Sequence, residues 1–141
     1  MQTEETIGRQ SDRAQKNHQV VTSLYEDLRR GDVASLVNAL SDRMDWVVAA
    51  GLPYGGRYRG REGVADAFAR INDAWQELAV LPAEIIAVGD LVIALGHYRG
   101  RGRATGMSME SRFVHLWRLE EGVPVAFETV ADTRTMVDAM R

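Results

Sequence analysis

The stretch from residue 91 to residue 131 constrains the fold more than any other part of the chain. Gly89-Asp90 precedes it and Glu121-Gly122 interrupts it, and both pairs are typical of tight turns between strands. Between these turns, large apolar side chains recur at every second position, as they do on one face of a β-strand. This pattern predicts long antiparallel strands with one face directed toward a core.

Two histidines fall on the face that this alternation predicts to be apolar. The odd positions of 91–97 are large and apolar up to His97, and the odd positions of 109–117 are mostly so and include His115. We expect both imidazoles on the inner face of a curved sheet, with His97 opposite Ser111 and the two rings at opposite ends of a ligand. A titratable ring in an apolar concavity suits proton transfer on a small molecule.

Helices are expected mainly before these strands, because apolar residues there recur at helical spacing and Gly31 supplies a stop. The glycine-rich residues 51–60 are expected to form a loop. The expected helices are Val20–Leu28, Val33–Leu40, Val64–Trp75 and a short one capped by Asp132 or Thr133, and the other expected strands are Met44–Ala50, Glu77–Val88 and Val123–Ala131. This order predicts an α+β fold with helices packed on one face of a bent sheet.

The length of 141 residues indicates one domain with a real core. Residues 1–17 are polar and mixed in charge, so we expect a leader that frays or extends the first helix, followed by a single domain over 18–141. That leader lacks the apolar core of a secretory signal, so a cytoplasmic location is expected.

Composition excludes several classes of function. The chain has no cysteine, which excludes disulfides and thiolate metal sites, and no motif predicts a metal or another cofactor. Its net charge of −3 gives no bias toward nucleic acid or anionic membranes, although arginine–glycine runs occur at 57–61 and 99–103. No apolar run is long enough to span a bilayer. We therefore expect a small-molecule ligand and no nucleic-acid or membrane partner.

The predicted inner face offers walls for a flat or cyclic ligand. Tyr54 lies in the glycine-rich loop near the expected mouth, where it would close over a ligand or donate its phenol. Filled-core packing is the alternative for the aromatic residues, and a satisfied core or rim histidine is the alternative for His97 and His115. The predicted ligand-contacting residues are Trp46, Val48, Leu95, Ser111, Phe113, Trp117, Phe127 and Thr129.

Four segments carry a resemblance to a known family. They are Tyr25–Asp32, Leu52–Gly60, Val114–Leu119 running into Glu121-Gly122, and Phe127–Thr133. In their order and spacing they resemble the nuclear-transport-factor-2-like superfamily, in its SnoaL-like and ketosteroid-isomerase-like branch. The resemblance extends over about residues 18–140.

The resemblance implies a cone-shaped α+β barrel. Its strongly curved antiparallel sheet would wrap a deep apolar pocket, with the N-terminal helices packed on the concave side. Such domains commonly form homodimers through the outer face of the sheet. The superfamily includes isomerases, polyketide cyclases, dehydratases, epoxide hydrolases and binding modules without activity.

Residue by residue, the resemblance gives this chain an unusual set of polar groups. The aspartate base of ketosteroid isomerases falls at Val48, which argues against true steroid isomerisation, and their oxyanion-hole acid falls at His115. Their helix-1 tyrosine aligns with Leu24, beside Tyr25. The aspartate of related epoxide hydrolases falls at Thr129.

Together these observations predict a cofactor-independent acid/base enzyme of isomerase, cyclase or dehydratase type, acting on a small apolar cyclic or polyketide-like substrate. His115 would stabilise or protonate an oxygen, and His97 would serve as a base or orient the substrate. Thr129 and Tyr54 would position the ligand. The alternative is a ligand-binding or dimeric assembly domain without catalysis.

Overall fold

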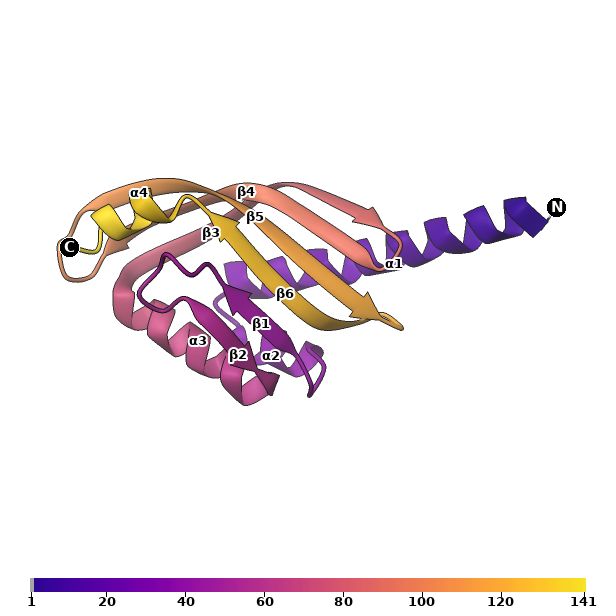
Figure 1. Cartoon of the computed structure of the whole chain (residues 1–141), viewed down its shortest axis with the longest axis horizontal. Helices are drawn as coiled ribbons and strands as arrows, with labels where there is room; N and C mark the ends of the chain where they lie inside the picture. Colours follow the sequence, from indigo (N-terminus) through magenta and orange to yellow (C-terminus); the bar gives the residue numbers. More distant parts are fainter. Residues whose placement is uncertain (1) are drawn as a thin grey trace.

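The computed structural model describes residues 2–141, with side chains described from residue 11 onward. A curved sheet forms one layer, and α1, α2 and α3 lie beneath its concave side (Figure 1). The elements are α1 Gln2–Arg29, α2 Val33–Ala39, β1 Asp45–Val48, β2 Gly56–Arg59, α3 Gly60–Ala74, β3 Trp75–Val88, β4 Leu91–Gly102, β5 Ser108–Glu120, β6 Val123–Ala131 and α4 Thr133–Asp138. The predicted α+β class is confirmed.

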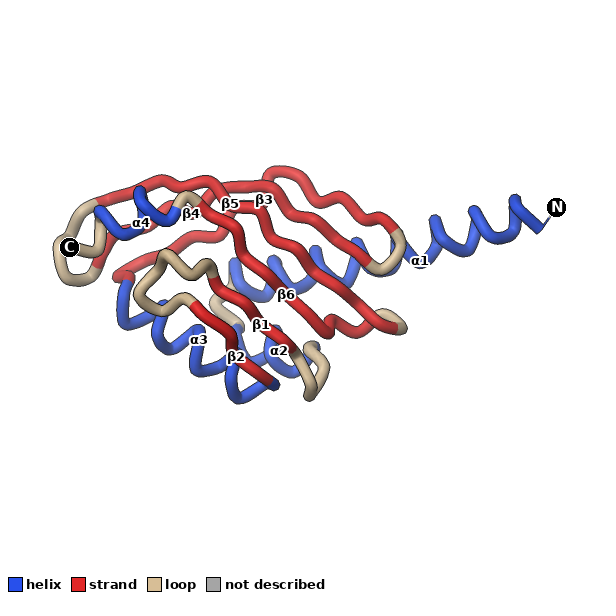
Figure 2. The backbone as a smooth tube through the Cα atoms, in the orientation of Figure 1, coloured by secondary structure: helices blue, strands red, loops and turns tan. Residues whose placement is uncertain are grey.

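The sheet has six strands in the order β2-β1-β6-β5-β4-β3 and does not close into a barrel (Figure 2). All neighbouring strands pair antiparallel except β1 and β6, which run parallel. β2 lies within the stretch 51–60, which was expected to be a loop, and pairs with β1 from Asp45↔Arg59 to Val48↔Gly56. The cone of the resemblance is therefore an open, strongly curved sheet.

Polar side chains cap α2 and α4 and anchor α1 to the sheet. Asp32 accepts a hydrogen bond from the backbone amide of Ser35 and caps α2, while Asp132 caps α4 through Thr135 in the same way. On α1, the buried Asn17 donates to the carbonyl of Gly89 at 2.9 Å. That contact ties the middle of the long helix to the β3–β4 turn.

The register of β4 differs from the predicted one by one residue. Tyr98, not His97, pairs with Ser111, and His97 pairs with Arg112. Successive residues of a strand face opposite sides, so a one-residue difference reverses the face of every side chain. His115 and Tyr98 lie on the inner face, whereas His97 and Leu95 lie on the outer face. The prediction that both histidines share one face is wrong.

Small residues face inward on β4 because neighbouring side chains occupy the space above them. A Cβ atom added at Gly96 would lie 2.9 Å from Cζ of Phe113, whose ring packs over this position. Ala94, which is fully buried, pairs with His115 and leaves room for the imidazole. The larger aliphatic residues of β4, namely Leu91, Ile93 and Leu95, therefore belong to the outer face.

Candidate functional site

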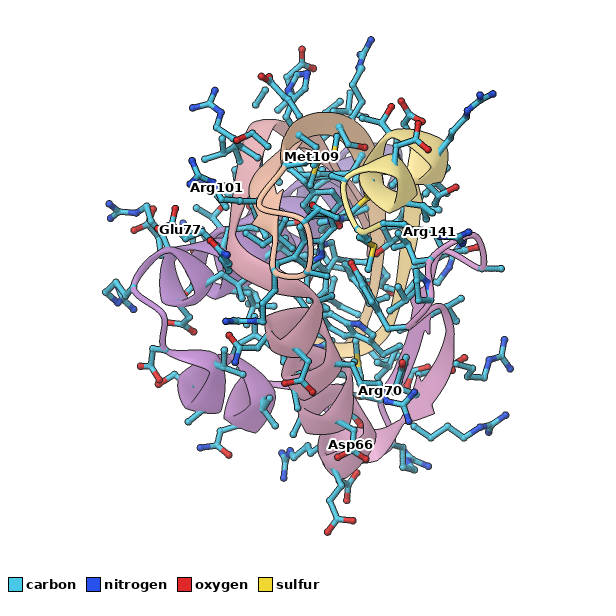
Figure 3. The ribbon with its side chains drawn as sticks, turned by 90° about the vertical axis from the view of Figure 1, so that its left-hand side faces the viewer. Asp66, Arg70, Glu77, Arg101, Met109 and Arg141 are labelled. Carbon is cyan, nitrogen blue, oxygen red and sulfur yellow. The ribbon has the colours of Figure 1, made fainter. Side chains whose placement is uncertain are left out.

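A cavity of about 490 Å³ lies between the concave face of the sheet and the helices. Its entrance is formed by the end of α1, the end of α3 and the middle of β3, where Arg29, Asn72 and Leu81 are exposed. In the end-on view of Figure 3, side chains crowd the space between the sheet and α3, and Arg70 of that helix lies toward β2, with its guanidinium 5.9 Å from the ring centroid of Tyr58. The cavity is therefore a deep space with one exposed rim.

The cavity wall is mainly apolar and aromatic. Trp46 stacks on Phe127, with ring centroids 3.9 Å apart, and meets Trp117 edge to face at 5.6 Å. No aspartate or glutamate occurs among the lining residues of the described chain, and Arg29 at the rim is the one charged residue there. The polar side chains farther inside are Tyr25, Tyr54, Tyr98, His115 and Thr129.

His115 is hydrogen-bonded through both ring nitrogens. Its Nδ1 lies 2.6 Å from the hydroxyl of Tyr25 on α1, and its Nε2 lies 2.6 Å from the hydroxyl of Tyr98 on β4. The ring also stacks on Phe113, with centroids 3.8 Å apart and an interplanar angle of 11°. Three elements thus fix the orientation of one buried imidazole.

The partners of Tyr25 are compatible with a defined arrangement of protons. The indole Nε1–H of Trp117 can only donate, and it donates to the Tyr25 oxygen at 3.0 Å. Tyr25 can then give its own proton to Nδ1 of His115, its second hydrogen-bond partner. In that tautomer Nε2 carries the imidazole proton and donates it to Tyr98. The proton of Tyr98 remains available for Thr129 or for a ligand.

Burial keeps these groups uncharged at neutral pH. It lowers the pKa of His115 from 6.5 to about 3, because a charged imidazolium would lose its solvation. Burial raises the pKa of Tyr98 far above its usual value, and a hydrogen bond with Thr129 opposes this rise. The pKa of Tyr25 is raised for the same reason, opposed by its hydrogen bond with Trp117. The site can therefore donate and accept hydrogen bonds without carrying a charge.

Tyr54 forms a second polar point in the wall. Its hydroxyl accepts a hydrogen bond from Nε1 of Trp75 at 3.1 Å, and its backbone carbonyl accepts one from the hydroxyl of Tyr58 at 2.6 Å. Burial raises the pKa of the Tyr54 phenol. Because Trp75 supplies the proton in the first bond, the hydroxyl proton of Tyr54 is free to donate to a ligand.

The structure brings together most of the predicted site residues, although their roles stay predictions. The predicted site residues that line the cavity are Trp46, Val48, Tyr54, His115, Trp117, Phe127 and Thr129. Ser111 and Phe113 are buried on the inner face but lie outside the cavity wall. There Ser111 donates to the carbonyl of Asp132, and Phe113 supports His115.

Two predicted site residues lie elsewhere. His97 and Leu95 are half-buried on the outer face of β4, where they pair with Arg112 and Val114. Neither reaches the cavity, so His97 cannot act on a ligand bound there. The physical reason is the register of the β4–β5 hairpin. The glycines and the threonine of 102–106 indicate a turn, but they do not determine which residues of the two strands pair.

Sequence reasoning missed Tyr25 and Tyr98, which are the two partners of His115. The resemblance aligned the helix-1 tyrosine with Leu24, but the structure turns Tyr25 into the cavity wall and leaves Leu24 in the core. Tyr98 was placed on the outer face with the reversed register. A signal existed in each case, since Tyr25 stands in the first quoted segment and Tyr98 follows His97 directly.

The part of the chain that the structure describes has neither a metal-holding cluster nor a membrane-spanning helix. No three side chains of His, Cys, Asp or Glu come together in a way that could hold a metal ion. None of the helices there is both long enough and apolar enough to cross a membrane.

Comparison with known proteins identifies the family. The family model described as the SnoaL-like domain matches residues 21–126. The chain belongs to the SnoaL-like domain family. No curated protein matches the sequence.

Solved structures of the same fold come from several proteins. An NTF2-like protein from Burkholderia thailandensis is 32% identical over 89% of this chain and 97% of its own, with a TM-score of 0.85. TerC, co-crystallised with polyporic acid, is 22% identical over 89% of this chain and 98% of its own, with a TM-score of 0.82. A putative SnoaL-like polyketide cyclase from Jannaschia is 14% identical over 91% of this chain and 93% of its own, with a TM-score of 0.79.

Proposed function

We propose that this SnoaL-like domain is a cofactor-independent enzyme that binds a small, apolar cyclic molecule and moves protons on it, as an isomerase, cyclase or dehydratase does. The observation that carries this proposal is a cavity of about 490 Å³ whose apolar wall presents a doubly hydrogen-bonded imidazole. Apolar cavities of this size with a few convergent polar groups are typical small-molecule sites. The fold shared with a putative polyketide cyclase and with a protein co-crystallised with polyporic acid supports the ligand class.

The chemistry rests on uncharged donors. The hydroxyl of Tyr98, held by Nε2 of His115, would donate to a ligand oxygen as negative charge develops on it. Preorganised donors in a site that excludes water stabilise such charge strongly. Val48 and Thr129 stand where the resemblance has aspartates, so the reaction differs from steroid isomerisation by an aspartate base.

Ligand binding can be tested with a thermal-shift panel of aromatic ketones, lactones and quinones. A molecule that binds only the folded protein raises its melting temperature. The variant Val48→Phe, which places a ring in the cavity, should lose the shift that the wild type shows. An equal shift in both proteins would contradict binding in the cavity. For a substrate found in this way, unchanged turnover by His115→Phe would contradict the catalytic role of His115.

A second function, ligand binding without catalysis, is favoured by one specific observation. The lining residues of the described chain include no carboxylate, and the pKa of His115 is lowered to about 3, so no side chain there is a strong base at neutral pH. The two functions differ in turnover. A binding module would hold its ligand unchanged over hours, whereas the enzyme would convert it.

We also propose a homodimer through the outer face of the sheet. Three large apolar residues on this face are exposed, namely Ile86, Val88 and Val130. The half-buried Ile93 and Leu116 pair with each other between β4 and β5 in the middle of the same face. A second copy would cover these side chains and remove them from water.

A further inference from the structure

The proposed function leaves one question open in chemical terms, namely where a proton taken from the ligand would go. A neutral imidazole offers one donor and one acceptor. His115 uses both, and with the proton on Nε2 it accepts from Tyr25 at Nδ1 and donates to Tyr98. Both tyrosines line the same cavity, at the two ends of this chain of hydrogen bonds.

We propose that Tyr25, His115 and Tyr98 form a proton relay that accepts a proton from a hydroxyl group of the ligand at Tyr25 and returns one to a carbonyl oxygen of the same ligand at Tyr98. This inference rests on the proposed function, because it requires a ligand in the cavity. It assigns catalytic roles to two tyrosines. It also predicts that the ligand carries a hydroxyl group conjugated to a carbonyl group, as an enolised 1,3-diketone does.

The relay conserves protons and charge. The ligand O–H bond breaks and its proton goes to the Tyr25 oxygen, while Tyr25 passes its own proton to Nδ1 of His115. Nε2 passes its proton to Tyr98, and Tyr98 gives its hydroxyl proton to the ligand carbonyl oxygen. Within the ligand, the electron pair of the broken O–H bond forms the new C=O bond, and the π electrons of the old C=O bond move onto its oxygen. The product is the tautomer of the ligand.

Solvent can restore the starting tautomer of His115 after the product has left. After one passage Nδ1 carries the imidazole proton and Tyr98 donates to Nε2. Solvent that enters the emptied cavity can carry a proton from Tyr25 back to Tyr98 and reset the ring. The imidazole thus changes its tautomer and never its charge, which fits a ring whose charged form is strongly disfavoured by burial.

The arrangement also predicts a polarity of recognition. With the proton on Nε2, the Tyr25 oxygen can accept from a ligand and the Tyr98 hydroxyl can donate to one. A ligand with one hydroxyl and one carbonyl matches both phenols. A ligand in which the hydroxyl is methylated matches only Tyr98.

The test compares 5-phenylcyclohexane-1,3-dione with its enol methyl ether by calorimetry, at about pH 5, where the dione keeps a neutral enol fraction. The neutral enol should bind the wild type about tenfold more tightly than the ether, as expected for one additional buried hydrogen bond. Tyr25→Phe should abolish this difference, and Tyr98→Phe should weaken the binding of both compounds. Tyr58→Phe, which removes a phenol of similar hydrogen bonding outside the cavity wall, should leave the ratio unchanged.

A second readout follows the ring of His115 by ¹⁵N NMR of histidine-labelled protein, with His115→Gln identifying its signals. The free protein and the ether complex should show the proton on Nε2. The dione complex should show a fraction of the ring with its proton on Nδ1, because transfer through the relay returns the same ligand with the roles of its two oxygens exchanged. A structural role of the tyrosines alone would not produce this change.

The outcomes separate the relay from the proposed function. If neither compound binds, the proposed ligand cavity fails and the relay with it. If the ether binds and the dione binds no better, or if Tyr25→Phe keeps the tenfold advantage, the relay is wrong while the cavity stands. A dione complex with the proton on Nε2 alone also overturns the relay.

Discussion

His115 has two hydrogen-bonding partners and almost no contact with solvent, and these two facts determine its chemistry. Its side chain is 3% exposed, and both nitrogens lie 2.6 Å from tyrosine hydroxyls. Burial lowers its pKa to about 3, so the ring is neutral throughout the physiological range. A neutral ring can polarise a carbonyl through Tyr98, but it cannot donate a proton as an imidazolium.

The lowered pKa of His115 predicts how stability depends on pH. In the unfolded chain the imidazole binds a proton below about pH 6.5, whereas in the folded protein it does so only near pH 3. The unfolded state therefore gains protons first as the pH falls, and this group's contribution to the free energy of unfolding decreases by about 1.4 kcal/mol per pH unit. Urea denaturation of the wild type and of His115→Gln should show their difference narrowing by about 2 kcal/mol between about pH 7 and pH 5.

The outer-face histidine supplies the matched control. His97→Gln should keep the pH dependence of the wild type, because this variant leaves His115 and its tyrosines in place. If His115→Gln and the wild type show parallel pH profiles, His115 is not held neutral by burial.

At the scale of single elements, the long helix α1 depends on a few polar contacts with the hairpin above it. Asn17 is 1% exposed and donates to the carbonyl of Gly89, and His18 lies 3.1 Å from the carbonyl of Ile85 through Nε2. These contacts fix the position of α1 along the sheet. The same helix carries Tyr25 two turns later, so the placement of Asn17 also places one end of the hydrogen-bonded chain at His115.

Removing the Asn17 contact should loosen α1. Asn17→Ala leaves the carbonyl of Gly89 without this donor, and we expect a loss of about 1–3 kcal/mol in the free energy of unfolding. Gln19→Ala, an exposed change on the same helix, should cost far less. Denaturation curves that are equal for the two variants would contradict the role of Asn17.

Gly96 tests the packing of β3 and β5 against β4. An added Cβ would meet the carbonyl oxygen of Leu81 and lie 2.8 Å from Cα of Pro82 and 2.9 Å from Cζ of Phe113. Gly96→Ala should therefore destabilise the fold by about 1–3 kcal/mol and displace the Phe113 ring from His115. The melting temperature and the aromatic NMR signals of Phe113 measure these effects. An alanine tolerated without change in either would show that β3 moves aside freely.

At the scale of the whole molecule, the sequence predicted the class of fold because long alternating strands and helical stripes are local patterns. It also offered Asp132 or Thr133 as the cap of the last helix, and Asp132 is the cap, which depends on neighbouring residues alone. The faces of β4 were not predictable in this way. The register of a hairpin depends on the geometry of its turn and on packing between distant residues. In β4 the larger aliphatic side chains face outward.

The candidate site likewise combines residues that the sequence predicts with residues that only the tertiary structure brings together. His115 and the aromatic wall follow from the strand pattern and from the resemblance. Tyr25 and Tyr98 come from α1 and β4, 90 and 17 residues away from His115 along the chain, and only the tertiary structure brings them to its two nitrogens.

The outer apolar face leads to a prediction about assembly. A charge at the centre of this face, as in Leu116→Glu, should convert the proposed homodimer into a monomer, because the new carboxylate lies across the strands from Glu128 and like charges are costly at an interface. Analytical ultracentrifugation measures the mass directly. Asn72→Arg, which places a charge at the cavity rim on α3 instead, should leave the mass unchanged. A wild type that sediments as a monomer at high concentration would contradict the dimer.

The central claim is that the cavity presents an uncharged imidazole held between two phenols. A pH titration of the ¹⁵N signals of His115 tests it most directly. We expect one protonated and one unprotonated ring nitrogen from about pH 8 down to about pH 4.5. Protonation of both nitrogens with a midpoint near 6.5, the ordinary value for histidine, would contradict it.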